Sequence, residues 1–450
     1  MNFYKEELDN FIHTRPISQE LWKKSIERIP GGISHNIRNL GLPLIGGFPV
    51  FIKSGHDAYL IDVDNHEYID YWQGHYSMLL GHNHPVIQQT LIDKLKNGWH
   101  FGTVTIDQLE LADTLVNDNP SIEEVRFSSS GTEAAMYAAR LARAFTGKSL
   151  IAKARMGWHG YADTLLYDVK APFLGKEGPG ILSEDKAGII TFEVNDEAVE
   201  ELIKEKANQL AGVIIEPVLG GGGGFPVKPE FMKMLREITE KHNILLIFDE
   251  IITGYRFSYG LFQNELKILP DLTTMGKIVG GGLSIGVVGG TKEIMEQANP
   301  QLNNRVWTGG GTFSAHPLSM AAGLKTLEIL KNSNRDYDRT NQTGSKFMTE
   351  MNEFFADEKL NIVATGYKSF ITLHVMRKYK ENPSPDEIVQ LTDKKCEALL
   401  QLVLLNRHIS GMHGIGALSF VHSRDHIQKT QEVLEEISPP ISKTYFQKKQ

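Results

Sequence analysis

Short apolar runs alternate with amphipathic stretches through the middle of the chain, from about residue 80 to residue 330. The apolar runs are rich in β-branched residues and predict strands at 124–128, 150–154, 212–216, 244–248 and 286–289. Helical periodicity between the runs predicts helices at 132–145, 197–209 and 228–242. Strand–helix alternation is typical of an α/β fold with a mostly parallel central sheet and helices on both faces. The unbroken run 244–248 suits a strand buried on both sides.

The two ends of the chain follow other patterns. Residues 1–30 predict an amphipathic helical lead-in, and short apolar runs at 49–53 and 58–63 predict strands. After about residue 330 the chain is charged and helical, with one further strand predicted at 370–375. We therefore expect a smaller α+β domain formed by the chain termini beside a large central domain. The expected boundaries are an N-terminal segment at 1–80, the large domain at 81–330 and a C-terminal small domain at 331–450.

Glycine is clustered in the sequence. The 450 residues include 42 glycines, with runs at 220–224, 280–282 and 309–311. There is no Gly-X-Y period, which excludes a collagen-like chain. Clustered glycines in a globular chain mark sharp turns or close approach of the backbone to a ligand.

Charge and cysteine content narrow the class of protein. The net charge of −8 is spread along the chain and argues against a nucleic-acid partner. A single cysteine, Cys396, excludes an intramolecular disulfide framework and a multi-cysteine metal site. No secretory signal and no run of about 18 apolar residues is visible, so we expect no membrane span and a cytoplasmic location.

Polar residues follow the predicted strands at their carboxyl ends, where open α/β sheets bind ligands. After the strand 124–128 come Ser130, Gly131 and Thr132, and then a helix. The free N–H groups of that helix end and the two hydroxyls form a cradle for an anion, most naturally a phosphate. Plain helix capping by serine or threonine is the alternative interpretation.

Three further residues carry candidate chemistry, two of them after predicted strands. Trp158, in Gly-Trp-His-Gly, either stacks on a planar ring or is a buried core residue. Asp249 ends the apolar run 244–248, where it could bind a metal, act as a base, pair with a protonated heterocycle nitrogen or cap a helix. Lys277 lies between apolar residues and glycines, so desolvation would make its amine a nucleophile unless it is exposed on a turn.

Taken together, these four features describe one ligand. A phosphate cradle, a stacking aromatic ring, a carboxylate for a pyridinium nitrogen and a lysine for a carbonyl are the groups that bind pyridoxal 5′-phosphate (PLP). The sequence therefore predicts a PLP enzyme.

The motifs resemble those of a known family, the fold-type I, class III PLP-dependent aminotransferases. Within that group the chain is most similar to the glutamate-1-semialdehyde aminomutases. The resemblance extends from about residue 30 to the late 420s. It is carried in order by Pro30–Arg38, Tyr68–Tyr71, Gly81–Pro85, Ser130–Ala134, Trp158–Gly160, Ile215–Pro217, Phe248–Glu250, Gly276–Gly282 and Gly311–Pro317.

The resemblance implies roles for the cofactor residues. Lys277 matches the lysine that bonds covalently to PLP and moves the substrate proton. Asp249 matches the acid that keeps the ring nitrogen protonated. Ile251 and Trp158 match the residues on the two ring faces, with His159 beside Trp158 in the same motif. The phosphate loop is matched by Ser130, Gly131 and Thr132.

The resemblance also implies partners. Glu216 matches a strand-end acid beside the cofactor, and Arg38 matches an arginine that binds the substrate carboxylate. A guanidinium group is well suited to that ligand. Thr312 matches a threonine that reaches the phosphate of the neighbouring subunit's cofactor. We therefore expect a homodimer with shared active sites.

Departures from the aminomutase pattern indicate the reaction. Gly221 stands where the aminomutase has an asparagine, and His75 stands in place of a tryptophan near the substrate. By spacing, Gly414 falls where the aminomutase carries a glutamate. An aminomutase must keep its intermediate in a closed site, so these changes favour an aminotransferase that releases a keto product.

We expect the enzyme to transfer an amino group between a carboxylate-bearing amine, a β-amino or unusual α-amino acid, and a keto acid. The alternatives on the same scaffold are the aminomutase and an amino-acid racemase or epimerase.

Two other enzyme classes fit the sequence less well. The glycine runs suggest a dinucleotide-binding dehydrogenase, but no G-x-G-x-x-G motif with a downstream acid follows a strand. A metal enzyme could use His82, His84 and Asp249, yet the PLP interpretation needs no metal. A non-catalytic member of the fold is disfavoured because Lys277 and Asp249 are both present.

Overall fold

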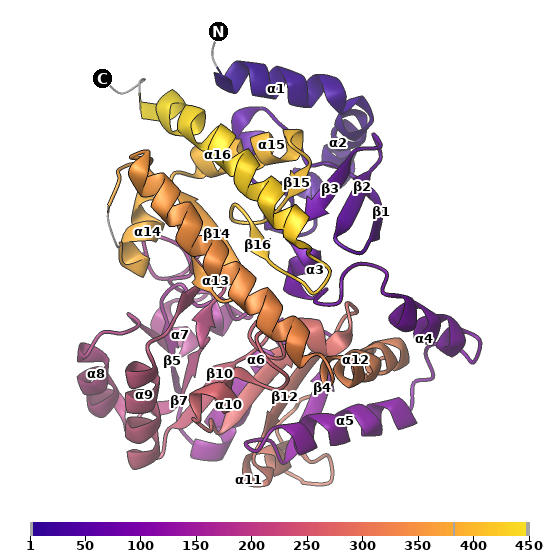
Figure 1. Ribbon diagram of the computed structural model, residues 1–450. Coiled ribbons are helices and arrows are strands. Elements are labelled where there is room, and N and C mark those ends of the chain that lie inside the picture. The colour runs from indigo at the N-terminus through magenta and orange to yellow at the C-terminus, as the bar shows by residue number, and fades with distance from the viewer. Residues whose placement is uncertain (1–2, 381–382, 447–450) are drawn as a thin grey trace. The chain divides into compact units, whose positions relative to one another are not determined.

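The computed structural model describes residues 3–380 and 383–446. The chain forms two compact units (Figure 1). The terminal unit contains the residues up to 84 and those from 338 onward, and the central unit contains residues 85–337. Residues 81–84 thus belong to the terminal unit and residues 331–337 to the central unit, whereas the sequence placed both on the other side of the boundary. Residues 1–2 of the predicted lead-in lie outside the described residues.

The central unit is built on a seven-stranded sheet with the order β4-β12-β11-β10-β7-β5-β6. Its strands are β4 (Glu124–Ser128), β5 (Leu150–Ala154), β6 (Ile189–Phe192), β7 (Leu210–Ile215), β10 (Leu245–Asp249), β11 (Leu272–Gly276) and β12 (Gly286–Gly290). The strands from β11 to β6 pair in parallel, and β12 is antiparallel to both β11 and β4. Only residues 277–285 join β11 to β12, and that segment is too short for the crossover that a parallel pair needs.

The strands of this sheet agree with the sequence pattern, with two omissions. β4 and β5 have the predicted bounds, and β7, β10 and β12 differ by one or two residues. The sequence pattern did not predict β6 or β11. β11 reads Leu-Thr-Thr-Met-Gly, so polar threonines interrupt its apolar run although all five residues are buried.

Helices cover both faces of the central sheet. Every residue of β7, β10, β11 and β12 is buried, which requires cover on both sides. An alanine-rich stripe of α6 packs in one apolar cluster with strand residues such as Ile214 and Ile247. The helices of this unit are α4 (Pro85–Leu95), α5 (Ile106–Asp118), α6 (Gly131–Thr146), α7 (Glu184–Ala187), α8 (Ala198–Lys206), α9 (Pro229–Lys241), α10 (Phe262–Leu266), α11 (Lys292–Met295) and α12 (Pro317–Leu330).

The terminal unit joins the two ends of the chain in one α+β core. A four-stranded sheet has the order β1-β2-β3-β15, and β15 from the C-terminal part pairs in parallel with β3 (Figure 1). A second sheet has the order β13-β14-β16. The strands are β1 (Ile52–His56), β2 (Tyr59–Asp62), β3 (Glu67–Asp70), β13 (Ile362–Tyr367), β14 (Phe370–Val375), β15 (Ile409–Ser410) and β16 (Gly416–Ala417). The helices are α1 (Phe3–Thr14), α2 (Pro16–Arg28), α3 (Gln73–Tyr76), α13 (Asn334–Asp357, in this unit from residue 338), α14 (Pro385–Leu391), α15 (Lys394–Asn406) and α16 (Arg424–Phe446).

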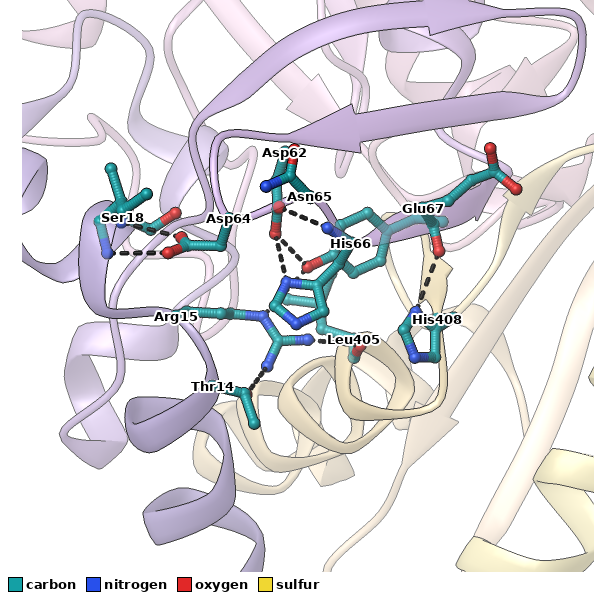
Figure 2. Close-up of polar contacts among 12 residues, drawn as sticks. Thr14, Arg15, Ser18, Asp62, Asp64, Asn65, His66, Glu67, Leu405 and His408 are labelled. Atoms are coloured by element: carbon teal, nitrogen blue, oxygen red, sulfur yellow. Dashed lines mark hydrogen bonds and ion pairs between the residues drawn. The ribbon is translucent and has the colours of Figure 1, made fainter.

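A buried arginine links the ends of the chain inside this unit (Figure 2). Arg15, between α1 and α2, is only 1% exposed. Its Nε donates to the Tyr68 hydroxyl at 3.0 Å and its Nη2 donates to the Leu405 carbonyl at 2.7 Å. The Tyr68 hydroxyl in turn donates to Asp62 Oδ2 at 2.6 Å. The network therefore ties the N-terminal helices to the β2–β3 hairpin and to α15.

Replacing Arg15 with methionine is expected to lower the free energy of unfolding of the terminal unit by about 3 kcal/mol, because buried acceptors would lose their donor. Urea unfolding followed by circular dichroism measures this change. Arg28→Met is the matched control, since Arg28 is exposed on the last turn of α2. Equal unfolding midpoints for the two variants would contradict the assigned role of the network.

Candidate active site

Three predicted site residues, Glu216, Asp249 and Lys277, lie at the carboxyl ends of β7, β10 and β11, along one edge of the central sheet. Ile214 lies opposite Ile247, and Asp249 lies opposite Thr274. Glu216 directly follows β7, and Lys277 directly follows β11. Because these strands are parallel, their carboxyl ends meet at the same edge, which is where open α/β sheets bind ligands.

Asp249 is buried, and each of its two carboxyl oxygens has a hydrogen-bond partner. It is 2% exposed, and its Oδ1 accepts from the backbone N–H of Ile251 at 3.1 Å. Its Oδ2 lies 2.7 Å from Nδ1 of His159. Burial lowers the pKa of His159 despite the neighbouring Asp249 carboxylate, so we assign a neutral ring whose Nδ1–H donates to Asp249. The carboxylate keeps lone pairs for a further donor, such as a protonated ring nitrogen.

Lys277 is a partly buried lysine whose lowered pKa favours the neutral amine. Burial lowers its pKa to about 8, while the Asp249 and Glu216 carboxylates act in the opposite direction. A lysine with this pKa is a much better nucleophile near neutral pH than an exposed one. Its backbone has a φ of +49°, a left-handed conformation that costs a non-glycine residue about 1 kcal/mol. Such strain is typical of residues at functional sites.

Glu216 is the second buried acid of the site. It is 3% exposed. Its Oε1 accepts from the backbone N–H of Trp158 at 2.8 Å and its Oε2 accepts from that of Gly220 at 3.1 Å. Burial and the Asp249 charge raise the pKa of Glu216, whereas these two N–H groups and Lys277 oppose the rise. Glu216 thereby connects the loop after β5 with the glycine run after β7.

The N-terminus of α6 provides the anion cradle. The Ser130 hydroxyl accepts from the Glu133 backbone N–H at 3.3 Å, so its side chain caps the helix, as one of the two sequence interpretations had it. The Thr132 hydroxyl accepts from the Tyr161 backbone N–H at 3.2 Å. The first N–H groups of a helix, from Gly131 onward, have no acceptor within the helix and lie at its positive end. They suit a phosphate group without any side-chain charge.

Close packing of glycines brings the loops of the site together. A Cβ on Gly131 would lie 2.6 Å from Cδ1 of Ile251. Gly160 has a φ of +86°, and a Cβ there would lie 2.6 Å from Cα of Thr132. The loop that carries Trp158 is therefore held against the N-terminus of α6. Trp158 itself is partly buried.

The five-glycine run forms the turn of a small hairpin. β8 (Val218–Leu219) pairs with β9 (Phe225–Pro226), and the glycines 220–224 lie between them. A Cβ on Gly221 would lie 3.2 Å from Cβ of Trp158, and one on Gly222 would lie 2.9 Å from Cβ of Met156. The run is glycine-rich because the hairpin packs directly against the loop after β5.

Three further predicted site residues are each described within their own unit. Arg38 is exposed in a short 3-10 segment of the terminal unit (Asn36–Asn39). His75 belongs to the same unit, and its ring centroid lies 4.6 Å from that of Trp72. Thr312 is exposed in the central unit, after the glycines 309–311. The substrate role of Arg38 and His75 and the intersubunit role of Thr312 remain predictions.

Sequence reasoning missed two buried polar residues near the site. Thr274 lies opposite Asp249, and its Oγ1 is buried with no hydrogen-bond partner among the described residues. Lys153 is fully buried on β5. The signal for Lys153 was present in the sequence, because it is a charged residue inside the apolar run Leu-Ile-Ala-Lys-Ala.

These residues fit a phosphorylated pyridine aldehyde. The α6 N-terminus suits the phosphate, Asp249 suits the ring nitrogen, and the amine of Lys277 suits the aldehyde. Nε2 of His159 and Oγ1 of Thr274 are buried polar atoms without a partner in the described part of the chain, as expected beside a bound polar cofactor. The fold and this set of groups define a PLP-dependent enzyme of fold type I.

Comparison with known proteins agrees with this class. Residues 46–365 match the family model described as aminotransferase class-III. The chain is 39% identical over 370 residues to the glutamate-1-semialdehyde 2,1-aminomutase of Syntrophomonas wolfei, covering 80% of this chain and 84% of that protein. The chain therefore belongs to the class-III aminotransferase family, and its cofactor is PLP.

Two solved structures have the same fold over nearly the whole chain. A β-phenylalanine aminotransferase from Variovorax paradoxus is 26% identical with a TM-score of 0.85, and 96% of each chain is covered. A transaminase with PLP bound is 26% identical with a TM-score of 0.84, covering 96% of this chain and 99% of that one. The expected fold class, enzyme class and cofactor are confirmed.

Two other features concern membrane insertion and metal binding. Within residues 3–380 and 383–446, no helix is long and apolar enough to cross a membrane. The same residues contain no group of three or more His, Cys, Asp or Glu side chains that could hold a metal ion. His82, one of the considered metal ligands, is instead bonded to Asp70, with 2.7 Å between Nε2 and Oδ2.

Proposed function

We propose that this protein is a PLP-dependent aminotransferase that moves an amino group between a carboxylate-bearing amine, a β-amino or unusual α-amino acid, and a keto acid. The observation that carries the proposal is the backbone at Gly414. Its φ is +88°, and a Cβ there would lie 2.4 Å from Cβ of Leu373. The position therefore has no room for the glutamate expected of an aminomutase.

The residues of the site have distinct tasks in this reaction. When bound, PLP supplies an electron sink that stabilises negative charge on the substrate carbon. Asp249 keeps a proton on the ring nitrogen through its ionised carboxylate. Lys277 takes the proton from the substrate carbon and returns it, because its amine is neutral in part near neutral pH. Arg38 is proposed to bind the substrate carboxylate, and His75 to shape the pocket beside it.

A second candidate is the aminomutase reaction. The relative from Syntrophomonas wolfei bears that name and matches most of the chain. The β-phenylalanine aminotransferase supports the first candidate instead, because its name specifies a β-amino acid. A racemase or epimerase on this scaffold would use the same lysine without an amino acceptor.

We further propose a homodimer, in which a second copy of this chain covers an apolar surface of the central unit. Several large apolar side chains are exposed there, including Val104 at 79% and Trp307 at 70%. Val104 also lines a cavity of about 1050 Å³ together with Thr312, the residue expected to reach the partner's cofactor. Exposed apolar clusters of this kind are typical of protein interfaces. We also propose a cytoplasmic location. The one cysteine of the chain, Cys396, is buried and free, as is typical of proteins in a reducing compartment.

Mass balance separates the candidate reactions. The purified, PLP-loaded protein is incubated with β-amino and α-amino acids, each with and without a keto acid, and products are measured by chromatography. We expect a keto product and a new amino acid only when the acceptor is present. Isomerisation of glutamate-1-semialdehyde without an acceptor would establish the aminomutase and contradict the proposal.

A further inference from the structure

Four consecutive residues of the terminal unit, 73–76, have a left-handed backbone. Their φ values are +49° at Gln73, +57° at Gly74, +60° at His75 and +70° at Tyr76. Only the glycine adopts this conformation without cost, because a Cβ crowds the neighbouring carbonyl oxygen in a left-handed turn. Three strained residues within one turn persist only where the surrounding structure holds them. We therefore looked for the contacts that fix the turn 73–76.

Asp70, the last residue of β3, holds the start of the turn. It is fully buried. Its Oδ1 accepts from the backbone N–H of Trp72 at 3.0 Å, and its Oδ2 accepts from that of Gln73 at 3.1 Å. The side-chain amide of Gln73 donates in return to the Asp70 backbone carbonyl. These bonds join the end of β3 to the first residues of the turn.

His82 fixes the Asp70 carboxylate from the other side. Nε2 of His82 lies 2.7 Å from Oδ2 of Asp70, so we assign its N–H as a second donor to the oxygen that accepts from Gln73. The backbone of His82 is itself held by Asp57. Each residue donates its N–H to the carbonyl of the other, at 2.8 and 2.9 Å. A series of contacts thus runs from the β1–β2 hairpin through His82 and Asp70 to the turn 73–76.

Packing of Tyr76 holds the far end of the turn. Tyr76 is 6% exposed, and its ring meets that of Phe370 on β14 edge-on, with 4.8 Å between the centroids. Aromatic pairs favour this geometry. Both ends of the turn are therefore anchored, whereas Gly74 and His75 between them are exposed or partly exposed.

The turn places His75 beside the segment that carries Arg38. The His75 ring lies against two others, with centroid distances of 4.6 Å to Trp72 and 4.9 Å to His35. His35 directly precedes the short helix 36–39, which contains Arg38. The two residues proposed to meet the substrate thus belong to neighbouring segments of one unit.

We propose that Asp70 and His82 are positioning residues, which hold the turn 73–76 in its left-handed form and thereby fix where His75 meets the substrate. The backbone conformation sets the direction of the His75 ring, because a return to an ordinary negative φ would redirect its Cα–Cβ bond. The inference rests on the substrate role proposed for His75, whichever of the candidate reactions the enzyme catalyses.

Crystal structures of PLP-loaded variants test whether these residues hold the turn. His82→Leu removes the donor to Asp70, whereas His82→Gln keeps an amide donor that can replace the ring N–H. We expect the turn 73–76 to lose its left-handed φ values in His82→Leu and to keep them in His82→Gln. If His82→Leu does not fold, Asp70→Asn carries the same expectation, because its amide places a donor where Asp70 has an acceptor.

Steady-state kinetics of the same proteins test the consequence for the substrate. We expect His82→Leu to raise KM for the amine about tenfold and to leave kcat near the wild-type value, because the lost positioning served binding. His82→Gln should restore the wild-type KM. The probe is the amino donor that the mass-balance assay identifies, or glutamate-1-semialdehyde if the enzyme isomerises it.

A second buried aspartate–histidine pair in the same unit provides the matched control. Asp62 is fully buried, and Nδ1 of His66 lies 3.1 Å from its Oδ2. This pair lies within the β2–β3 hairpin instead of at the turn. His66→Leu removes a comparable bond and should leave both the turn 73–76 and KM unchanged.

Three results would overturn the proposal. They are a left-handed turn that persists in folded His82→Leu or Asp70→Asn, a displaced turn with an unchanged KM, and an equal rise of KM in His66→Leu, which would indicate a general loosening of the unit. Absence of aminotransferase turnover would refute the proposed function but not this role, which the crystal structures and the KM for glutamate-1-semialdehyde would still test.

Discussion

Replacing Lys277 with alanine is expected to lower turnover by more than about 10³-fold, because the variant loses both the nucleophilic amine and the group that moves the substrate proton. PLP should still bind, since the α6 N-terminus and Asp249 remain. Borohydride should attach the cofactor covalently to wild type at Lys277 and not to the variant, as mass spectrometry of the digested protein would show.

The matched control for this prediction is Lys233→Ala. Lys233 is an exposed lysine on α9, with a side chain 75% exposed, and its loss should leave turnover and borohydride labelling unchanged. Turnover by Lys277→Ala at the wild-type rate would refute the mechanism.

The pKa of Lys277, about 8, predicts a pH dependence of cofactor attachment. Below this pH, the rate at which cofactor-free enzyme bonds to PLP should fall about tenfold per pH unit, because only the neutral amine reacts.

Replacing Asp249 with asparagine is expected to lower kcat by about 10²- to 10³-fold, with the fold and the cofactor retained. The asparagine oxygen still accepts a hydrogen bond, so the contact with His159 at 2.7 Å can persist. It carries no charge, however, and cannot stabilise a proton on the ring nitrogen. Steady-state kinetics, with PLP content measured by absorbance, tests this prediction.

Asp93→Asn provides the comparison for Asp249→Asn. Asp93 is an aspartate on α4 with a side chain 56% exposed, and the same substitution there should leave kcat unchanged. An Asp249→Asn enzyme with full PLP content and wild-type kcat would show that this carboxylate does not control the ring nitrogen. Loss of PLP from the variant would instead locate the role of Asp249 in cofactor binding.

The regular part of the fold could be predicted because burial leaves a periodic pattern. β5, an apolar strand, has the bounds that the sequence predicts, and α6 extends the predicted helix by one residue at each end. β11 was missed since its threonines are buried without being apolar. The antiparallel direction of β12 follows from a short connection rather than from the strand's own residues.

The candidate site residues came from local signals in the sequence. Asp249 was singled out at the end of an apolar strand, and Lys277 by its apolar and glycine neighbours, together with the resemblance to the family. The role of Ser130 was left open between capping and phosphate binding, and the structure shows a cap. Lys153 was overlooked, although it is a charged residue in an apolar run, because the sequence does not reveal which acids lie near it.

The sequence by itself determined the fold class and the cofactor, and it predicted the residue types that would hold the cofactor. These depend on local order along the chain: apolar periodicity, glycines at turns and polar groups at strand ends. Only the tertiary structure decided which charges meet, because His159 reaches Asp249, and Lys153 shares a face with Glu216, through strand pairing between distant segments. The same packing explains the glycine run 220–224, whose hairpin needs the space beside Trp158 that any larger residue would fill.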